Sequence, residues 1–320
     1  MNFRGARPNK RHGKYWRKAL KGMELYWRSD FRAELALFAF VAALVAFAAP
    51  AFAKTKHAFV VGINRYENLP PHAQLKKAVG DASAMGEALK ALGFVVDPPL
   101  EGPTRSEFFS RWYPFLNQVR EGDTVAFVFS GHGVEFGGAN YLLPRDTTPV
   151  REGLEGLLRS ESLPFDQLLA DLRARKPAFS FVVLDACRNN PFRENGRSLV
   201  GGRGGLAIVG GKDSFVMYSA GAGQTALDSL GPADNSPTSV FTRILLPLLC
   251  PPGKPANLTD VATEVAKTVT ALASTVGHEQ TPAVYFQLTN GPASLGHCQP
   301  DKPPPPHCIR DPNDPGKCTK

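Results

Sequence analysis

Apolar positions between residues 57 and 288 fall into two alternating kinds of segment. Short runs of apolar and β-branched residues with few charges indicate strands that are buried on both faces. Longer segments with apolar residues three and four positions apart indicate amphipathic helices. The predicted strands are residues 58–64, 94–96, 123–130, 179–187, 214–219 and 283–288, and the predicted helices are residues 75–92, 107–119, 163–175, 238–249 and 258–276.

This alternation predicts an α/β protein with a mostly parallel, six-stranded sheet that is flanked by helices on both faces. Gly93 and Gly277 come just after two predicted helices, where glycine commonly ends a helix, and Ser162 and Asn257 come just before two others as candidate caps. In open α/β sheets the ligand site lies beyond the carboxyl ends of the strands. Reactive side chains at those ends are therefore the candidates for function.

The N-terminal segment differs from the rest of the chain. A basic stretch, residues 1–34, leads into an uncharged apolar run of 19 residues, 35–53, that ends in Ala51-Phe-Ala53. These features predict a signal peptide cleaved after Ala53, or a membrane anchor, because a bilayer crossing needs about 20 apolar residues. The basic flank is long for a signal peptide, which points either to translation from Met23 or to a retained anchor. We therefore expect an exported protein, periplasmic or extracellular, with the inner membrane as the site of any anchor.

The net charge of +8 is concentrated in that segment. Residues 1–53 contain ten Lys/Arg and three Asp/Glu, a net of +7, which leaves 27 minus 26, or +1, for residues 54–320. The body of the chain thus offers no electrostatic basis for nucleic-acid binding. Contact with a membrane is expected only through the N-terminal segment.

The cysteines divide into one residue at the end of a predicted strand, Cys187, and an even set downstream. In an exported chain such an even set favours two disulfides, and four cysteines allow three connectivities. A metal site is the alternative, although the spacings are wide for zinc. The downstream set is Cys250, Cys298, Cys308 and Cys318, the last three within a Pro-rich tail, residues 291–320, that we expect to be irregular.

Two predicted strands end in reactive side chains. His132 follows the strand at 123–130, and Cys187 ends the strand at 179–187. If these strands are neighbours in a parallel sheet, their carboxyl ends bring an imidazole and a thiol together. This is the arrangement of a cysteine nucleophile with a histidine base.

Several motifs stand in a fixed order around this pair. They are Val61-Gly-Ile-Asn64 with Tyr66, Asp81-Ala82, Ser130-Gly-His-Gly133, Tyr141-Leu-Leu-Pro-Arg-Asp146, Asp185-Ala-Cys187 and Tyr218-Ser-Ala220. Together they resemble the caspase-like cysteine peptidases and, within them, the metacaspases and bacterial caspase-like proteins. The resemblance covers about residues 57–290, and it implies a peptidase domain at 54–290, with a Gly-rich loop at 188–212 between its two halves, after the 1–53 segment and before the 291–320 tail.

The resemblance implies roles for three residues. Cys187 would attack a peptide carbonyl to give an acyl-enzyme, and His132 would take up and return the protons. The backbone amides of Gly133 and Cys187 would stabilise the oxyanion. The sequence identifies no third side chain to orient His132, so we expect a dyad. We expect no cofactor and no metal, and the calcium site of some metacaspases is not carried over because residues 134–140 lack an acidic cluster.

Substrate preference follows from Asp185, which lies two positions before Cys187 and so on the same side of its strand. The metacaspase resemblance implies an acidic pocket formed by Asp81, Ser130, Asp185 and Ser219. Such a pocket favours protein or peptide substrates with Arg or Lys before the scissile bond. The alternative is that Asp185 only binds neighbouring backbone groups.

Other questions stay open at this level. The loop residues Arg193, Arg197, Arg203 and Lys212 are either self-processing sites or ordinary surface charges. The chain is either a peptidase or a catalytically silent scaffold of the same fold, and acyl transfer to another nucleophile would use the same dyad. The strand at 283–288 could pair with a second copy unless the tail covers that edge, so the oligomeric state is undetermined.

Overall fold

The computed structural model describes residues 54–136, 139–148, 155–187, 213–221, 223–289, 293–299, 309–311 and 314–319. The predicted leader at 1–53, the loop at 188–212 with its four basic residues, and Cys308 lie outside the described residues. The strands are β1 (Lys56–Gly62), β2 (Val95–Val96), β3 (Leu100–Glu101), β4 (Thr124–Phe136), β5 (Ala139–Leu142), β6 (Leu163–Pro164), β7 (Phe179–Cys187), β8 (Ser214–Tyr218), β9 (Ala283–Gln287), β10 (Ile309–Asp311) and β11 (Asp314–Thr319). The helices are the 3-10 helix η1 (Pro71–Ala73), α2 (Ala78–Ala91), α3 (Arg105–Gln118), α4 (Glu155–Glu161), α5 (Phe165–Ala174), α6 (Val240–Leu249) and α7 (Leu258–Ser274).

The main sheet confirms the α/β class. Its central path has the order β2-β1-β4-β7-β8-β9, and these six strands are the six that the hydrophobic pattern predicts. All neighbours on this path are parallel except β8 and β9. The predicted total of six is wrong for the sheet as a whole, which has nine strands because β3, β5 and β6 pair at its side. These three strands have only two to four residues each.

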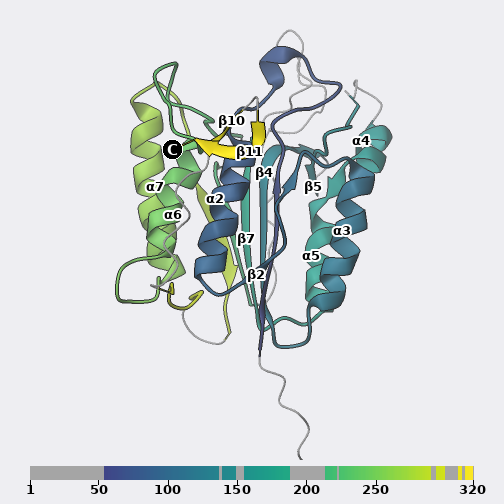
Figure 1. Cartoon of the computed structure of the whole chain (residues 1–320), viewed down its shortest axis with the longest axis vertical. Coiled ribbons are helices and arrows are strands. Elements are labelled where there is room, and N and C mark those ends of the chain that lie inside the picture. The colour runs from purple at the N-terminus through teal and green to yellow at the C-terminus, as the bar shows by residue number, and fades with distance from the viewer. Residues whose placement is uncertain are drawn as a thin grey trace, which may run out of the picture. The chain divides into compact units, whose positions relative to one another are not determined.

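Helices cover both faces of the sheet, as Figure 1 shows. On one face α3 and α5 pack an aromatic-rich core that includes Trp112, Phe59 and Phe127. On the other face α2, α6 and α7 pack the second core, which includes Val60 and Phe215. Successive strand residues point to opposite faces, so a strand that is covered on both sides must be apolar throughout. This explains the uninterrupted apolar runs in the sequence.

The helix ends agree in part with the sequence signals. Asn257 caps α7 by accepting the backbone N–H of Thr259 at 3.0 Å, and Gly277 adopts a φ of 68° after the helix, both as predicted. The predicted cap at Ser162 is wrong. Its hydroxyl donates to the carbonyl of Leu158 at 2.6 Å, because the preceding α4, which the hydrophobic pattern did not reveal, ends there.

The structure shows one disulfide among the four downstream cysteines, within the residues that it describes. Cys250, at the end of α6, and Cys298 form a disulfide with their Cα atoms 5.5 Å apart. The tail beyond residue 300 is not wholly irregular, because β10 and β11 form a separate two-stranded antiparallel sheet. That sheet includes the backbone of Cys318.

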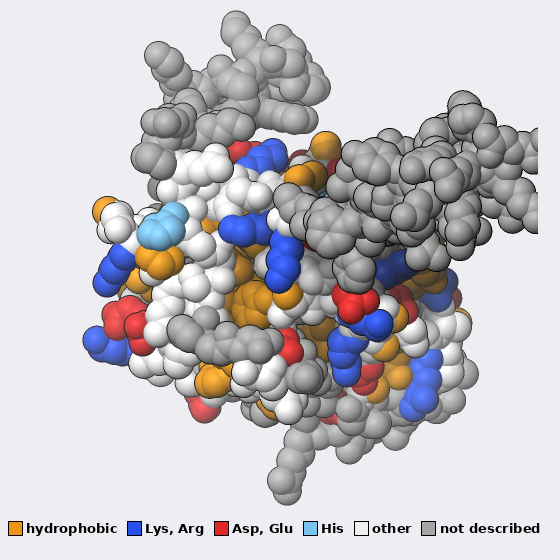
Figure 2. Space-filling view, turned by 90° about the horizontal axis from the view of Figure 1, so that it is seen from below, with side chains coloured by type: hydrophobic (Ala, Val, Ile, Leu, Met, Phe, Trp, Pro, Cys, Tyr) orange, Lys and Arg blue, Asp and Glu red, His pale blue; other side chains and the backbone are white. Residues whose placement is uncertain are grey.

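On the described residues that Figure 2 shows from below, Lys and Arg side chains are interspersed with Asp and Glu and form no patch of one sign. Among the residues that the structure describes, no helix is long and apolar enough to cross a membrane.

Candidate active site

The register of β4 and β7 brings the two predicted reactive residues side by side. β4 runs six residues beyond the predicted end of that strand, to Phe136, so His132 lies inside it. In the parallel pairing of β4 with β7, His132 is the Cα partner of Cys187, and Ser130 is the partner of Asp185. These four residues therefore lie at the same end of the sheet, where β4 and β7 both approach their carboxyl ends.

The His132 side chain is buried and held by backbone contacts. Its Nε2 lies 2.6 Å from the carbonyl oxygen of Ala73, and its own backbone N–H donates to Tyr66 Oη at 2.7 Å. The Tyr66 and His132 rings lie 4.8 Å apart. A carbonyl can only accept a hydrogen bond, so Nε2 carries the proton and Nδ1 carries the lone pair. Nδ1 is buried and has no hydrogen-bond partner among the described residues.

The environment of His132 also affects its protonation. Burial lowers the pKa of the imidazole, while the Ala73 carbonyl and the negative charge of Asp228 oppose that effect. Neutral imidazole is the form that accepts a proton as a general base. The Ala73 carbonyl thus supplies the orienting group that the sequence did not identify, and it does so from the backbone.

The segment between β1 and α2 places that carbonyl. The Asn64 side chain accepts the N–H of Val79 at 3.0 Å and donates to the carbonyl of Lys76 at 3.1 Å. The Gln74 side chain accepts the N–H of Tyr66 at 2.7 Å and donates to the Tyr66 and Leu69 carbonyls at 3.0 and 2.8 Å. These bonds fold the segment back on itself. They explain why an asparagine ends the first sequence motif and why α2 starts at Ala78 rather than at the predicted residue 75.

The glycine before His132 is required by packing. A Cβ on Gly131 would lie 2.7 Å from Tyr66 Oη and 2.9 Å from the ring of Phe129. Gly133, the predicted oxyanion residue, follows His132 in β4 and pairs with Leu142 of β5. The first glycine of the Ser-Gly-His-Gly motif therefore reflects the close approach of Tyr66 to the strand.

Two predicted pocket carboxylates lie close together in the protein interior. Asp81, on α2, accepts the Ser130 hydroxyl at 2.9 Å and the backbone N–H of Ser239 at 2.7 Å. Asp185, on β7, accepts the hydroxyls of Ser239 at 2.5 Å and Thr242 at 3.2 Å. Burial raises the pKa of Asp185, and burial together with the charge of Asp185 raises that of Asp81 well above its usual range.

A third carboxylate completes this pocket. Asp228 accepts the backbone N–H groups of Lys76 and Lys77 at 3.1 and 3.2 Å. With a volume of about 20 Å³ the pocket has room for little more than a water molecule. No Lys, Arg or His side chain is among the described residues of its wall. That wall consists of Leu75, Ala78, Asp81, Ser130, Gly131, Asp185, Ala226, Leu227, Asp228 and Ser239.

Ser219 stands apart from the other predicted pocket residues. It follows β8, its carbonyl accepts Gln280 Nε2 at 2.8 Å, and its buried hydroxyl has no hydrogen-bond partner among the described residues. The hydroxyl lies near enough to Asp185 to oppose the rise of that pKa, but Ser219 is not part of the pocket wall.

Some residues of the site were not predicted from the sequence. Asp228, Ser239 and Thr242 have no local pattern that marks them, because they meet Asp81 and Asp185 only through the fold. Metal ligands are not grouped here: among the described residues, no three His, Cys, Asp or Glu side chains lie close enough together to hold a metal ion.

The parallel sheet and the paired His and Cys positions define a caspase-like α/β protein, and comparison with known proteins agrees. The sequence matches the family model for the caspase domain over residues 55–291, and the chain belongs to that family. Its fold is similar to the crystal structure of caspase-1 from Spodoptera frugiperda, with a TM-score of 0.52 and 18% sequence identity. The similarity covers 78% of this chain and 92% of that chain. No match was found among curated proteins.

Proposed function

We propose that this protein is a cysteine endopeptidase that cleaves after Arg or Lys through an acyl-enzyme on Cys187. The observation that carries the proposal is the acidic pocket at the same sheet edge as the His132 and Cys187 pair. Asp185 connects the two, because it lies two residues before Cys187 and lines the pocket. Membership of the caspase family supports peptidase chemistry, and the pocket supports the basic specificity.

The chemistry follows from the protonation of His132. The Cys187 sulfur attacks the scissile carbonyl while His132 Nδ1 accepts the thiol proton and then gives it to the leaving amine. The backbone N–H groups of Gly133 and Cys187 stabilise the oxyanion. In the second half-reaction His132 takes a proton from water, the hydroxide attacks the thioester, and the proton returns to the sulfur.

The pocket supports recognition of a cation. Three aspartates line it, and its described wall holds no positive side chain. Two of them, Asp81 and Asp185, are buried, which is costly for carboxylates unless a cation or hydrogen bonds compensate. A guanidinium or ammonium before the scissile bond would supply that cation. The pocket is too small for such a side chain as it stands, so loop 227–239 or the start of α2 must move on binding.

Hydrolysis of three fluorogenic peptides tests this proposal. The peptides share a sequence and differ in having Arg, Lys or Asp before the reporter. We expect cleavage of the Arg and Lys peptides by the wild type and none by Cys187→Ala. A preference for the Asp peptide would contradict the acidic pocket.

A catalytically silent scaffold of the same fold would behave differently. A thiol-directed inhibitor with an Arg side chain should label the wild type at Cys187. No labelling, or equal labelling of Cys187→Ala, would favour the scaffold.

We further propose that the protein is exported and processes itself in the loop at 188–212. The Cys250–Cys298 disulfide supports export, because disulfides persist in oxidising compartments. Cleavage at Arg193, Arg197, Arg203 or Lys212 would match the proposed specificity. Identical bands from the wild type and Cys187→Ala on a denaturing gel would argue against self-processing.

A further inference from the structure

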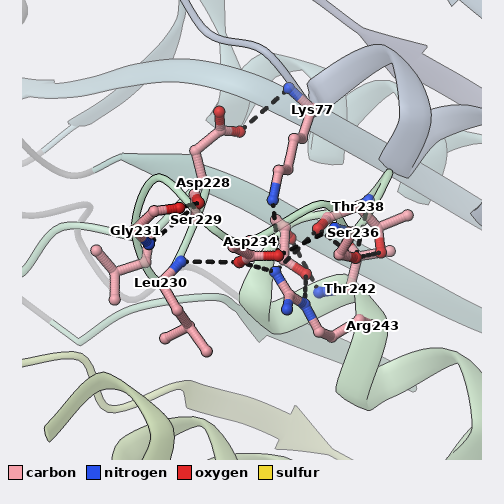
Figure 3. Close-up of polar contacts among 12 residues, drawn as sticks. Lys77, Asp228, Ser229, Leu230, Gly231, Asp234, Ser236, Thr238, Thr242 and Arg243 are labelled. Atoms are coloured by element: carbon pink, nitrogen blue, oxygen red, sulfur yellow. Dashed lines mark hydrogen bonds and ion pairs between the residues drawn. The ribbon is translucent and has the colours of Figure 1, made fainter. Parts of the chain in front are cut away.

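Asp234 lies at the centre of a network beside the acidic pocket, in the loop that connects β8 to α6. Its carboxylate accepts the backbone N–H groups of Leu230 at 2.8 Å and Ser236 at 3.0 Å. It also forms ion pairs with Lys77 at 3.3 Å and with Arg243 at 2.6 Å. Figure 3 shows these contacts meeting at Asp234 from Lys77, just before α2, from Arg243 on α6, and from the loop itself.

The Asp234 carboxylate is well suited to hold cations. Its side chain is only 8% exposed, so its ion pairs are shielded from water. The hydrogen bond from Arg243 holds the pKa of Asp234 well below its usual range, with further contributions from the Leu230 and Ser236 amides. Asp234 therefore stays ionised throughout the pH range in which the protein is expected to work.

Lys77 lies between this network and the pocket. Its backbone N–H donates to the pocket carboxylate of Asp228, while its ammonium group extends the other way, to Asp234. Leu75 and Ala78, on either side of it, line the pocket, whereas the Lys77 side chain does not. The Lys77 side chain is 10% exposed, so its charge needs an anion within the protein.

Two sets of carboxylates are candidate ion-pair partners for that ammonium group. One is Asp234, and the other is the set of pocket carboxylates, of which Asp228 is bonded to the backbone of Lys77 itself. Lysine is a point charge on a flexible four-carbon chain, and exchange of one partner for the other would proceed by rotation of that chain. An ammonium group in the pocket would occupy the place of the substrate cation.

We propose that Asp234 determines substrate affinity by holding the Lys77 ammonium group out of the acidic pocket. The inference rests on the proposed specificity for Arg and Lys. Asp234 acts through Lys77 and is a positioning residue. Without it, Lys77 pairs with the pocket carboxylates and competes with the substrate from within the chain.

The test is Asp234→Asn, assayed with the Arg peptide. The KM is expected to rise at least tenfold while kcat changes by less than threefold. The rate at which iodoacetamide alkylates Cys187 should stay within twofold of the wild type, because a small neutral reagent does not use the pocket. A merely structural loss would lower kcat and alkylation together with affinity, and that outcome overturns the inference.

The double variant Lys77→Met/Asp234→Asn separates charge from loop geometry. It removes the displaced cation and keeps the net charge of the cluster unchanged. Its KM should be at least threefold below that of Asp234→Asn, and an equal or higher KM overturns the inference. If Asp234→Asn does not fold, the double variant alone tests the proposal. Its KM for the Arg peptide is then expected within threefold of the wild-type value, and a tenfold rise would contradict the proposal.

Asp123→Asn is the matched control. Asp123 is also buried, accepts the N–H groups of Thr55 and Arg120, each at 2.8 Å, and lies 3.6 Å from His57 Nε2. It precedes β4 and so lies at the opposite end of that strand from the pocket. The KM of Asp123→Asn for the Arg peptide should stay within twofold of the wild-type value. A wild type without a preference for Arg would instead refute the proposed function, and this inference with it, before any variant is compared.

Discussion

The carbonyl oxygen of Ala73 lies 2.6 Å from Nε2 of His132, although 59 residues separate them in the chain. This contact fixes the imidazole tautomer and leaves Nδ1 as the basic nitrogen. A histidine base needs a group that accepts a hydrogen bond from its second ring nitrogen and so orients the ring. Here the backbone carbonyl of Ala73 is that group. The site thus depends on the conformation of the loop between β1 and α2, which Gln74 stabilises.

Gln74→Glu should weaken catalysis without weakening substrate binding. The change keeps one acceptor and removes the two donor bonds to the Tyr66 and Leu69 carbonyls. Each such bond contributes about 1 kcal/mol, and about 1.4 kcal/mol is a tenfold change in rate. We expect kcat to fall roughly tenfold with KM within twofold, measured with the Arg peptide.

Asn68→Ala is the control for that experiment. Asn68 belongs to the same loop but donates to the carbonyls of Asp146 and Thr147, away from His132. The kcat of Asn68→Ala should stay within twofold of the wild-type value. Equal losses in the two variants would show that Gln74 has no particular effect on His132.

Gly131→Ala should impair both folding and catalysis. The added methyl group would lie 2.7 Å from Tyr66 Oη, which accepts the backbone N–H of His132. Overpacking of this kind costs about 1–3 kcal/mol. We expect a lower melting temperature and a kcat reduced at least tenfold. A variant with wild-type stability and activity would show that Tyr66 does not constrain the strand.

Asp185→Asn should make the protein more stable and the proposed enzyme less active. Burial raises the pKa of Asp185, so the folded state binds more protons than the unfolded state at pH values between the two pKa values. Stability therefore falls as pH rises through that window, and the loss remains at neutral pH. Replacing Asp185 by asparagine removes the ionisable group and with it this loss of stability.

Thermal unfolding at pH 7.5 measures this effect. About 1 kcal/mol shifts the melting temperature of a domain of this size by roughly 2–4 °C, and we expect an increase on that scale. Cleavage after Arg should fall at least tenfold in the same variant. Asp123→Asn should instead lower the melting temperature, because Asp123 is held by backbone amides at a distance from the pocket. A destabilised Asp185→Asn would indicate that its hydroxyl bonds outweigh the cost of burial.

The KM for the Arg peptide should increase on acidification, starting at a higher pH than the usual aspartate pKa of about 3.9. Asp81 and Asp185 both have raised pKa values, so the pocket loses negative charge as pH falls through those values. The measurement is KM between pH 5 and 8 for peptides that differ only in Arg or in an uncharged residue before the scissile bond. A KM ratio that is independent of pH would contradict the recognition of a cation by this pair.

The Cys250–Cys298 disulfide closes a loop of 48 residues. In the chain-entropy account such a cross-link stabilises the folded state by about 4 kcal/mol. Reduction or Cys250→Ser should therefore lower the melting temperature. The mass of the exported protein before and after reduction counts the disulfides, and it also shows whether cleavage occurred after Ala53. A fully reduced protein with an intact leader would contradict export.

Much of this architecture was predictable from sequence because it depends on local patterns. The apolar runs at 123–130 and 179–187 identify strands covered on both faces, and the asparagine and glycine around α7 mark its ends. Short strands such as β5 and the helix α4 were not predicted, because they are stabilised by contacts with neighbours rather than by a periodic sequence. The extension of β4 through His132 likewise depends on its pairing with β5 and β7.

The sequence by itself determined the order of the six central strands and of five helices, the identity of the histidine and cysteine, and the position of Asp185 two residues before the cysteine. The tertiary structure decided what those residues meet. It placed Cys187 in register with His132, brought the Ala73 carbonyl to Nε2, and brought Asp228 to the backbone of Lys77 across 151 residues. Side-chain periodicity follows from the geometry of a single strand or helix, whereas such contacts depend on loop conformation and on packing between elements.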